Sequence, residues 1–181
     1  MPKWLKVVAA VIGGLLLAAG GLGALLASQP SSYRLSRVRT IPVSSEVIRP
    51  LITDLRAHDR WMKHFADPHD PPATTFSANT TEPGAWVERK DSVSASRMTL
   101  DEVSASGVRF TNENRGRFGT GRATVELLLR QKGPSSTEVE YVLSGELSGV
   151  RRLLWSAVDL EERVGPDLER SLDQLEHACA R

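Results

Sequence analysis

Histidine and aspartate side chains, which bind metals and transfer protons, gather in one short segment of the chain. Within thirteen residues the sequence carries His58, Asp59, His64, Asp67, His69 and Asp70. Zinc sites use such ligands at spacings like HExxH, which align them on one helix face, and this segment has no spacing of that kind. The pair His58-Asp59 also lacks the further ligands that a phosphohydrolase needs. The segment is therefore interpreted as a polar loop, and no metal site is predicted.

A glycine-rich segment and a single cysteine are the next candidates. Residues 116–121 read Gly-Arg-Phe-Gly-Thr-Gly, but they enter a run with strand periodicity, whereas phosphate-binding loops open a helix. A flexible turn at the rim of a cavity is the better interpretation. Cys179 excludes an intramolecular disulfide because it is alone, and its apolar neighbours predict a buried thiol. The sequence shows no recognisable Ser/His/Asp or Cys/His catalytic set, so no catalytic residue and no cofactor are predicted.

Two charged residues stand in the apolar phase of predicted strands. Arg89 shares the phase of Val87, and Glu102 shares that of Leu100. Alternate residues of a strand share one face, so both side chains would point inward if neither strand bulges. There they could orient the polar end of a ligand or serve acid–base chemistry. The alternative is that each lies near a strand end and reaches water, because charged side chains are seldom buried.

The elements that position these groups begin with the C-terminal stretch. Apolar residues recur at steps of three and four between Leu153 and Cys179, which predicts an amphipathic helix over residues 153–180. Gly165 and Pro166 interrupt the run, and we expect a kink there because proline removes one helical hydrogen bond. A helix of this length needs a large apolar partner.

That partner is predicted in the middle of the chain, where the hydrophobic period changes to two. Strands are expected over residues 33–41, 74–79, 85–91, 96–103, 108–114, 121–131 and 137–146. The turns between the later strands are short, so neighbours are antiparallel, with one apolar and one polar face. A short helix beginning at Ser44 or Ser45 and containing Pro50 is expected over residues 47–55, and a second helical piece over residues 54–65.

The N-terminus predicts a membrane anchor. A stretch of 21 residues without charge begins at Val7 and ends at Ala27, long enough to cross a bilayer and longer than the apolar region of most signal peptides. A cleaved signal peptide remains the alternative. We expect an anchor at 1–28 and a hinge at 29–32, with the following domain outside the cytoplasm. Small residues repeat every fourth position within the anchor, but an Ala/Gly-rich segment is the simpler interpretation, and no oligomeric state is predicted.

Composition and charge limit the kinds of partner. The chain has 181 residues, of which 40% are hydrophobic and 25% charged, as in an ordinary globular domain. Its net charge is +1, and after residue 30 it carries 21 basic against 22 acidic residues. This balance leaves no basic surface for a polyanion, so no nucleic-acid partner is predicted.

The amino-acid sequence resembles those of the SRPBCC superfamily, whose members include START-like and polyketide cyclase/dehydrase-type proteins. The matching stretches are residues 33–42, 47–56, 61, 97–100, 144–147 and 164–172. The resemblance covers about residues 33–180, within a domain predicted over residues 33–181, and more narrowly the chain resembles the bacterial branch with an N-terminal membrane segment. It departs from the Trp-x-Pro-Trp pattern, which is Trp61-Met62-Lys63-His64 here. The resemblance implies an α+β helix-grip (START/Bet v 1-like) fold, a curved antiparallel sheet of about seven strands around the C-terminal helix.

The resemblance also implies a cavity for an apolar ligand between sheet and helix. The alternation places these candidates on its wall: Met98, Leu100, Phe110, Val125, Leu127, Tyr141, Leu143, Leu168 and Leu172. Arg89 and Glu102 are the candidate polar groups. The first hypothesis is a membrane-anchored protein that binds a hydrophobic small molecule or lipid without turnover. The alternatives are a cyclase- or dehydratase-like enzyme, for which Glu102 or Arg89 would act, and an interaction module with a closed core.

Overall fold

The computed structural model describes four continuous parts of the chain. These are residues 31–62, 72–116, 119–147 and 159–180. The structure also describes positions 2, 4, 12–14, 17, 20, 21, 23 and 24 near the N-terminus. Most of the predicted anchor and residues 29 and 30 of the predicted hinge lie outside the described residues. Within the described part, no helix is long and apolar enough to cross a membrane.

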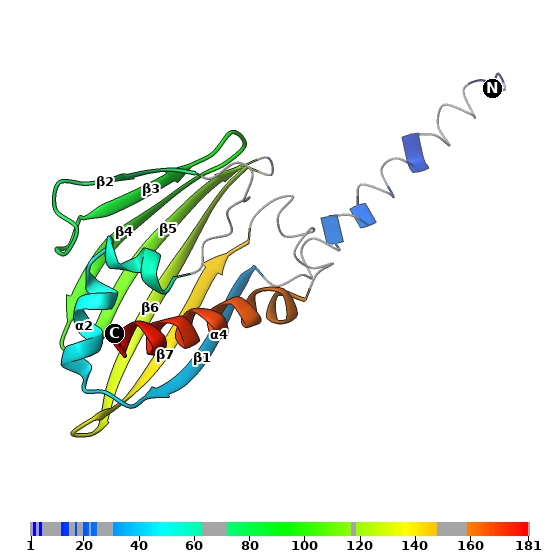
Figure 1. Ribbon diagram of the computed structural model, residues 1–181. Helices are drawn as coiled ribbons and strands as arrows, with labels where there is room; N and C mark the ends of the chain where they lie inside the picture. Colours follow the sequence, from blue (N-terminus) through cyan, green and yellow to red (C-terminus); the bar gives the residue numbers. More distant parts are fainter. Residues whose placement is uncertain are drawn as a thin grey trace.

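A curved antiparallel sheet of seven strands forms the body of the domain (Figure 1). The strands are β1 (Ser32–Ile41), β2 (Ala73–Phe76), β3 (Trp86–Lys90), β4 (Ala95–Ser104), β5 (Gly107–Gly116), β6 (Gly119–Gly133) and β7 (Ser136–Glu146). Their order is β1-β7-β6-β5-β4-β3-β2, so β1 is an edge strand and pairs with β7. The seven predicted strands are confirmed, and β2 is shorter than the prediction because it ends at Phe76.

Three helical elements lie on one face of this sheet (Figure 1). They are α2 (Ser45–Thr53), the 3-10 turn η1 (Ala57–Arg60) and the long α4 (Leu160–Cys179). The second helical piece was predicted to be longer than this single turn. Helix α4 begins at Leu160, later than the predicted Leu153, because the Asp159 side chain caps it by accepting hydrogen bonds from the first-turn amides. It continues through Pro166, and residues 153–158 lie outside the described part of the chain.

The inner face of the sheet, toward the helices, carries its side chains in rows that cross the strands. One row pairs Arg89 of β3 with Ser96 of β4, and Ser96 with Asn114 of β5. Rows farther along the strands hold larger apolar side chains, such as Phe110 of β5 beside Val125 of β6. The inner face therefore changes from polar at one strand end to apolar in the middle.

Under α2 the inner face closes into a dry core. Helix α2 packs on β5 and β6, and the fully buried side chains there include Ile48, Ile52, Trp61, Leu100, Phe110 and Leu127. Leu172 and Leu175, from the second half of α4, join the same cluster. Their burial confirms that the amphipathic helix covers the apolar face, as its periodicity predicts. Each such side chain contributes about 1.5–3 kcal/mol when it leaves water.

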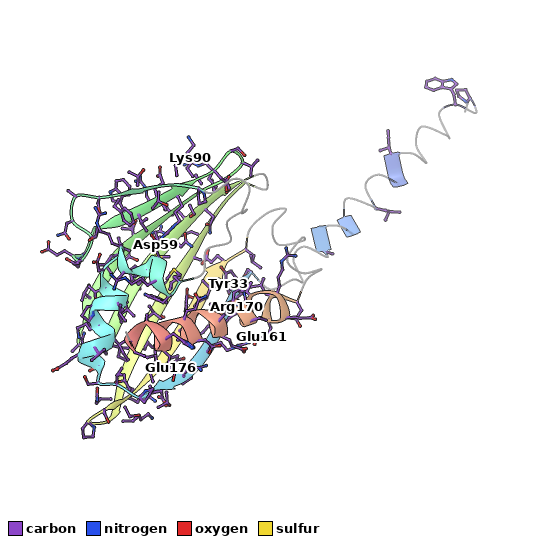
Figure 2. All side chains as sticks on the ribbon, viewed as in Figure 1. Tyr33, Asp59, Lys90, Glu161, Arg170 and Glu176 are labelled. Carbon is purple, nitrogen blue, oxygen red and sulfur yellow. The ribbon has the colours of Figure 1, made fainter. Side chains whose placement is uncertain are left out.

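Charged side chains hold the other edge of α4 against β1. Arg37 bridges Glu161 and Glu169 at 2.5 and 2.7 Å, and Arg39 contacts Glu176 at 2.6 Å. Glu161 and Glu176, labelled in Figure 2, lie near the two ends of α4. The hydrogen bond that Arg37 donates to Glu169 raises the pKa of Arg37 further above its ordinary value. Gly165 lets this seam close, because a Cβ there would lie 2.2 Å from a guanidinium nitrogen of Arg37. The seam holds α4 against β1 along most of its length, from Glu161 to Glu176.

Candidate functional site

A cavity of about 340 Å³ lies between the inner face of the sheet and the first half of α4. Strands β3 to β7 all contribute to its wall. The apolar residues that border it are Met62, Pro72, Met98, Val125, Tyr141, Leu143, Val164 and Leu168. The polar residues that border it are Arg89, Asp91, Ser94, Ser96, Asn112, Asn114, Asp167 and Ser171. A cavity of this size and mixed lining is at the lower end of the range for small-molecule sites, about 300–1,000 Å³.

The predicted wall residues divide into two groups. Five border the cavity, namely Met98, Val125, Tyr141, Leu143 and Leu168. The other four, Leu100, Phe110, Leu127 and Leu172, are at most 1% exposed and lie in the closed core. They share the predicted face, but α2, Trp61 and Leu175 cover them. Alternation assigns a residue to a face, and only the helices above decide whether that part of the face stays open.

Arg89 lies at the polar end of the cavity, on the inner face of β3. Its side chain is 8% exposed, and one guanidinium nitrogen lies 2.7 Å from a carboxylate oxygen of Asp59 in η1. The Asp59 side chain is half exposed, so the pair bridges the cavity wall and solvent. A buried guanidinium needs such a partner, because leaving water unpaired is costly. Arg89 is thus an inward polar group, as its phase predicts.

Glu102 is not a cavity residue, and the prediction that it points inward is wrong. Leu100 pairs with Phe110, whereas Glu102 pairs with Arg109, so β4 carries one extra residue at position 101. This bulge reverses the phase of the strand and turns Glu102 to the outer face. Its side chain is 49% exposed there and pairs with the Arg109 guanidinium. The inward orientation depended on a strand without a bulge, and the strand has one.

Asn112 is a functional candidate that the sequence analysis missed. It stands on β5 opposite Met98, on the inner face, and borders the cavity. Its Oδ1 atom is buried and finds no hydrogen-bond donor among the residues that the structure describes. Its position two residues after Phe110 on the same strand was the available signal. A buried acceptor without a donor is uncommon, because it keeps the cost of leaving water.

Tyr141 and α4 complete the wall. Burial raises the pKa of the Tyr141 phenol well above its usual range, so the hydroxyl stays neutral at physiological pH. On α4, Ser171 donates a hydrogen bond to the Asp167 carbonyl at 2.8 Å, and the Asp167 carboxylate pairs with Arg170 at 2.9 Å. These interactions satisfy the helix residues within the helix itself. They leave the polar end of the sheet as the part that can recognise a ligand.

The other motifs of the sequence do not assemble a site in the described part of the chain. His58 is buried, with its ring 5.2 Å from those of both Trp61 and Phe110, and its Nε2 lies 2.9 Å from the Ile52 carbonyl oxygen. It therefore packs the core. His64, Asp67, His69 and Asp70 lie outside the described residues. No group of three or more potential metal ligands occurs among the residues described.

The glycine-rich turn and the cysteine have different surroundings. Gly116 pairs with Gly119 where β5 turns into β6, and neither glycine is among the residues that border the cavity. Residues 117 and 118 lie outside the described part. Cys179 is half-buried at the end of α4 rather than fully buried. Burial and, secondarily, the Glu176 carboxylate raise the pKa of its thiol, which keeps it in the less reactive protonated form.

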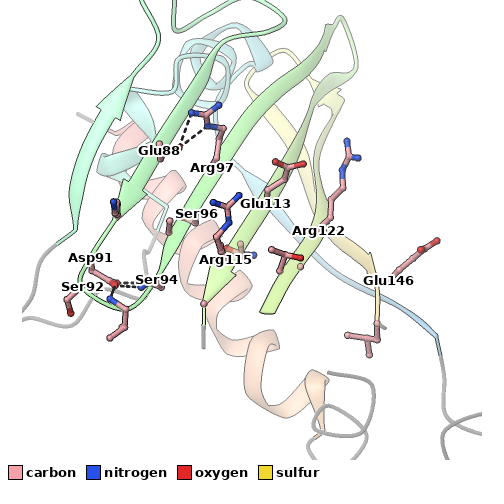
Figure 3. A pocket seen from close by; sticks show the side chains of 18 of the residues that line it. Glu88, Asp91, Ser92, Ser94, Ser96, Arg97, Glu113, Arg115, Arg122 and Glu146 are labelled. Atoms are coloured by element: carbon pink, nitrogen blue, oxygen red, sulfur yellow. Dashed lines mark hydrogen bonds and ion pairs between the residues drawn. The ribbon is translucent and has the colours of Figure 1, made fainter. Parts of the chain in front are cut away.

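A broad, open depression of about 1210 Å³ spans the outer face of the same strands and their polar ends (Figure 3). Its charges alternate across the sheet: Glu88 pairs in register with Arg97, Arg97 with Glu113, and Glu113 with Arg122. The Glu88–Arg97 ion pair is 2.9 Å long. Alternating charges on neighbouring strands neutralise one another. The depression is therefore best described as a solvated face.

Comparison with solved structures finds the same architecture in proteins of very different sequence. CV1439 from Chromobacterium violaceum is 16% identical with a TM-score of 0.56, over 84% of this chain and 99% of that one. Ginseng major latex-like protein 151 from Panax ginseng is 11% identical with a TM-score of 0.59, over 84% of this chain and 100% of that one. Norcoclaurine synthase from Thalictrum flavum, solved in complex with dopamine and hydroxybenzaldehyde, is 8% identical with a TM-score of 0.60, over 84% of this chain and 88% of that one.

No model of a protein family matches the sequence, and no curated protein matches it either. The similarities to solved structures cover nearly the whole of each compared chain, but at identities that are informative about architecture alone. They agree with the strand order and with the position of α4 across the curved sheet. The chain therefore has the helix-grip fold of Bet v 1-like and START-type proteins.

Proposed function

We propose that this protein is a membrane-anchored binding protein that holds a hydrophobic small molecule or lipid between the sheet and α4. The observation that carries the proposal is the cavity of about 340 Å³, which is apolar along β6 and β7, mixed along α4, and polar at the end of β3 to β5. Binding pockets for small molecules have this combination of apolar walls and a few polar groups. The volume favours a compact ligand or a single-chain lipid.

A binding role is favoured over a cyclase- or dehydratase-like reaction by the position of the charged groups. Glu102, the acid proposed for such chemistry, faces solvent on the outer side of the sheet. Arg89 is engaged by Asp59, and a guanidinium does not exchange protons at physiological pH. That norcoclaurine synthase was solved with two small aromatic molecules supports small-molecule binding by this architecture.

The membrane anchor is proposed from the sequence. The uncharged stretch from Val7 to Ala27 matches the thickness of a bilayer core, and Lys3 and Lys6 precede it. In this proposal the domain lies outside the cytoplasm of a bacterial cell, on the inner membrane. Resistance of the full chain to carbonate extraction would support the anchor, and digestion of the domain by protease added to spheroplasts would support the orientation. Release by carbonate would contradict the anchor.

Ligand binding is tested by native mass spectrometry of the full chain extracted in mild detergent. We expect one apolar adduct per chain in the wild type. Val164 borders the cavity, so Val164→Trp fills it and should remove the adduct. Val38 is 58% exposed on the outer side of β1, so Val38→Trp is the matched control and should retain it. A wild type without an adduct, or an adduct that both variants retain, would contradict the proposed cavity and favour a closed interaction module.

A further inference from the structure

We infer that the cavity selects an uncharged ligand, an apolar molecule with one hydroxyl head group that donates a hydrogen bond to Asn112. The inference rests on the proposed binding function and specifies the chemical class of the ligand. It starts from the division of the wall into an apolar part and a polar end, because an amphipathic ligand can enter such a cavity in one orientation only. Its head group then lies among Arg89, Ser96 and Asn112.

The charges around the polar end do not favour an anion. Arg89 is the only cationic side chain among the described residues that border the cavity, and Asp59 neutralises it at 2.7 Å. Asp91 and Asp167 also border the cavity. The pKa of Asp91 is lowered, chiefly by a hydrogen bond from the Ser94 hydroxyl, so Asp91 is ionised. A carboxylate ligand would therefore find no free cation in the cavity wall, because the Arg89 guanidinium is already engaged by Asp59.

A cationic head group is disfavoured by a different set of contacts. The carboxylate of Asp167 pairs with Arg170 at 2.9 Å. One oxygen of Asp91 accepts hydrogen bonds from the amides of Val93 and Ser94 at 2.8 and 2.6 Å, so the turn already satisfies it. Because a charged head group loses its hydration without a free counter-ion here, an uncharged one binds at lower cost.

Asn112 defines the hydrogen-bonding character of the head group. Its buried Oδ1 accepts no hydrogen bond from the described residues. A ligand hydroxyl can donate to this oxygen and at the same time accept a hydrogen bond from another polar group that borders the cavity. A ketone or ether cannot donate, so it would leave the Asn112 oxygen without a donor. Site groups that lose their partner in this way discriminate strongly between related ligands.

The test compares three probes with the same chain length: decanol, decanoate and decylamine. Equilibrium binding is measured at neutral pH with the full chain in lipid nanodiscs, and partition into the lipid is subtracted with the Val164→Trp variant. We expect decanol to bind about tenfold more tightly than either charged probe. We expect Asn112→Leu to lower the affinity for decanol about tenfold and to leave the affinities for the charged probes unchanged.

The outcomes separate this inference from the function on which it rests. Equal binding of the three probes, or tightest binding of decanoate or decylamine, would overturn the uncharged head group and leave the binding function standing. An unchanged decanol affinity in Asn112→Leu would overturn the role of Asn112. If no probe binds above the Val164→Trp background, the proposed binding function fails. The ranking of probes by the wild type does not depend on Asn112→Leu, so it holds even if that variant does not fold.

Discussion

Two regions of the same sheet face behave differently. Under α2, side chains such as Phe110 and Leu127 are fully buried and fill the space to the helix. Under the first half of α4, Leu143 and Val164 are only half-buried and border a cavity. Both regions have the alternation of a half-buried strand. The difference shows that a patterned face closes where α2, η1 and the second half of α4 cover it together, and stays open where the first half of α4 covers it alone.

The clearest way to break this comparison is the same substitution in each region. Leu127→Ala removes a fully buried side chain from the closed region and should cost about 3 kcal/mol of unfolding free energy. Leu143→Ala enlarges an existing cavity and should cost about 1 kcal/mol, because less of its surface is buried. Urea denaturation of both variants measures the difference. Equal losses would mean that the two regions are packed alike.

Asn112 sharpens the comparison from the other side. Asn112→Leu removes a buried acceptor that has no donor among the described residues, so it should raise the unfolding free energy of the unliganded protein by about 1–2 kcal/mol. Thr111 on the outer face of the same strand is the control. Its hydroxyl donates to Asp101 at 2.8 Å, so Thr111→Val should give no gain. Destabilisation by Asn112→Leu would show that the amide supports the fold.

Tyr141, which borders the cavity from β7, connects the comparison to pH. Burial raises the pKa of its phenol in the folded state, so the hydroxyl ionises first in the unfolded chain. Stability from this group is present below the unfolded value of about 10 and is lost as the pH rises above it, by up to about 1.4 kcal/mol per pH unit. Unfolding free energies of wild type and Tyr141→Phe should therefore diverge above pH of about 10. Parallel curves would show that the phenol reaches water.

The smallest effect is expected on the outer face. Arg109 pairs with Glu102 and lies 3.5 Å from Glu126, but its side chain is half exposed. Such pairs contribute about 0–1 kcal/mol because water and salt screen them. Arg109→Gln should therefore change the unfolding free energy by no more than about 0.5 kcal/mol, and added salt should reduce this further. A large loss would mean that the outer face contributes as much as the inner rows.

Much of the fold could be predicted from the sequence, because hydrophobic periodicity and turn residues are local features of the chain. The alternation in β6 and β7 placed Val125 and Tyr141 on the inner face. The three-and-four spacing placed Leu168 and Leu172 on the buried side of α4. The start of α4 was harder to predict. An apolar stripe continues through residues 153–158, whereas the described helix begins at Leu160 beside the capping carboxylate of Asp159. A stripe indicates a face and does not by itself fix a boundary.

The site was only partly predictable. Arg89 keeps its phase and is buried, but the phase of Glu102 was reversed by one extra residue in β4. A bulge depends on how the strand bends against its neighbour, and a single sequence carries little signal for it. Asn112 was overlooked because it is polar, although its position on the strand matches that of Phe110.

The sequence by itself determined which residues share a face, since the side-chain periods of strands and helices follow from backbone geometry. It also determined the chemical division of that face, polar at Arg89, Ser96 and Asn114 and apolar beyond. Only the tertiary structure decided where the face closes and where a cavity of about 340 Å³ remains. That outcome depends on sheet curvature and on the placement of α2 and α4, which are set by contacts between segments far apart in the chain.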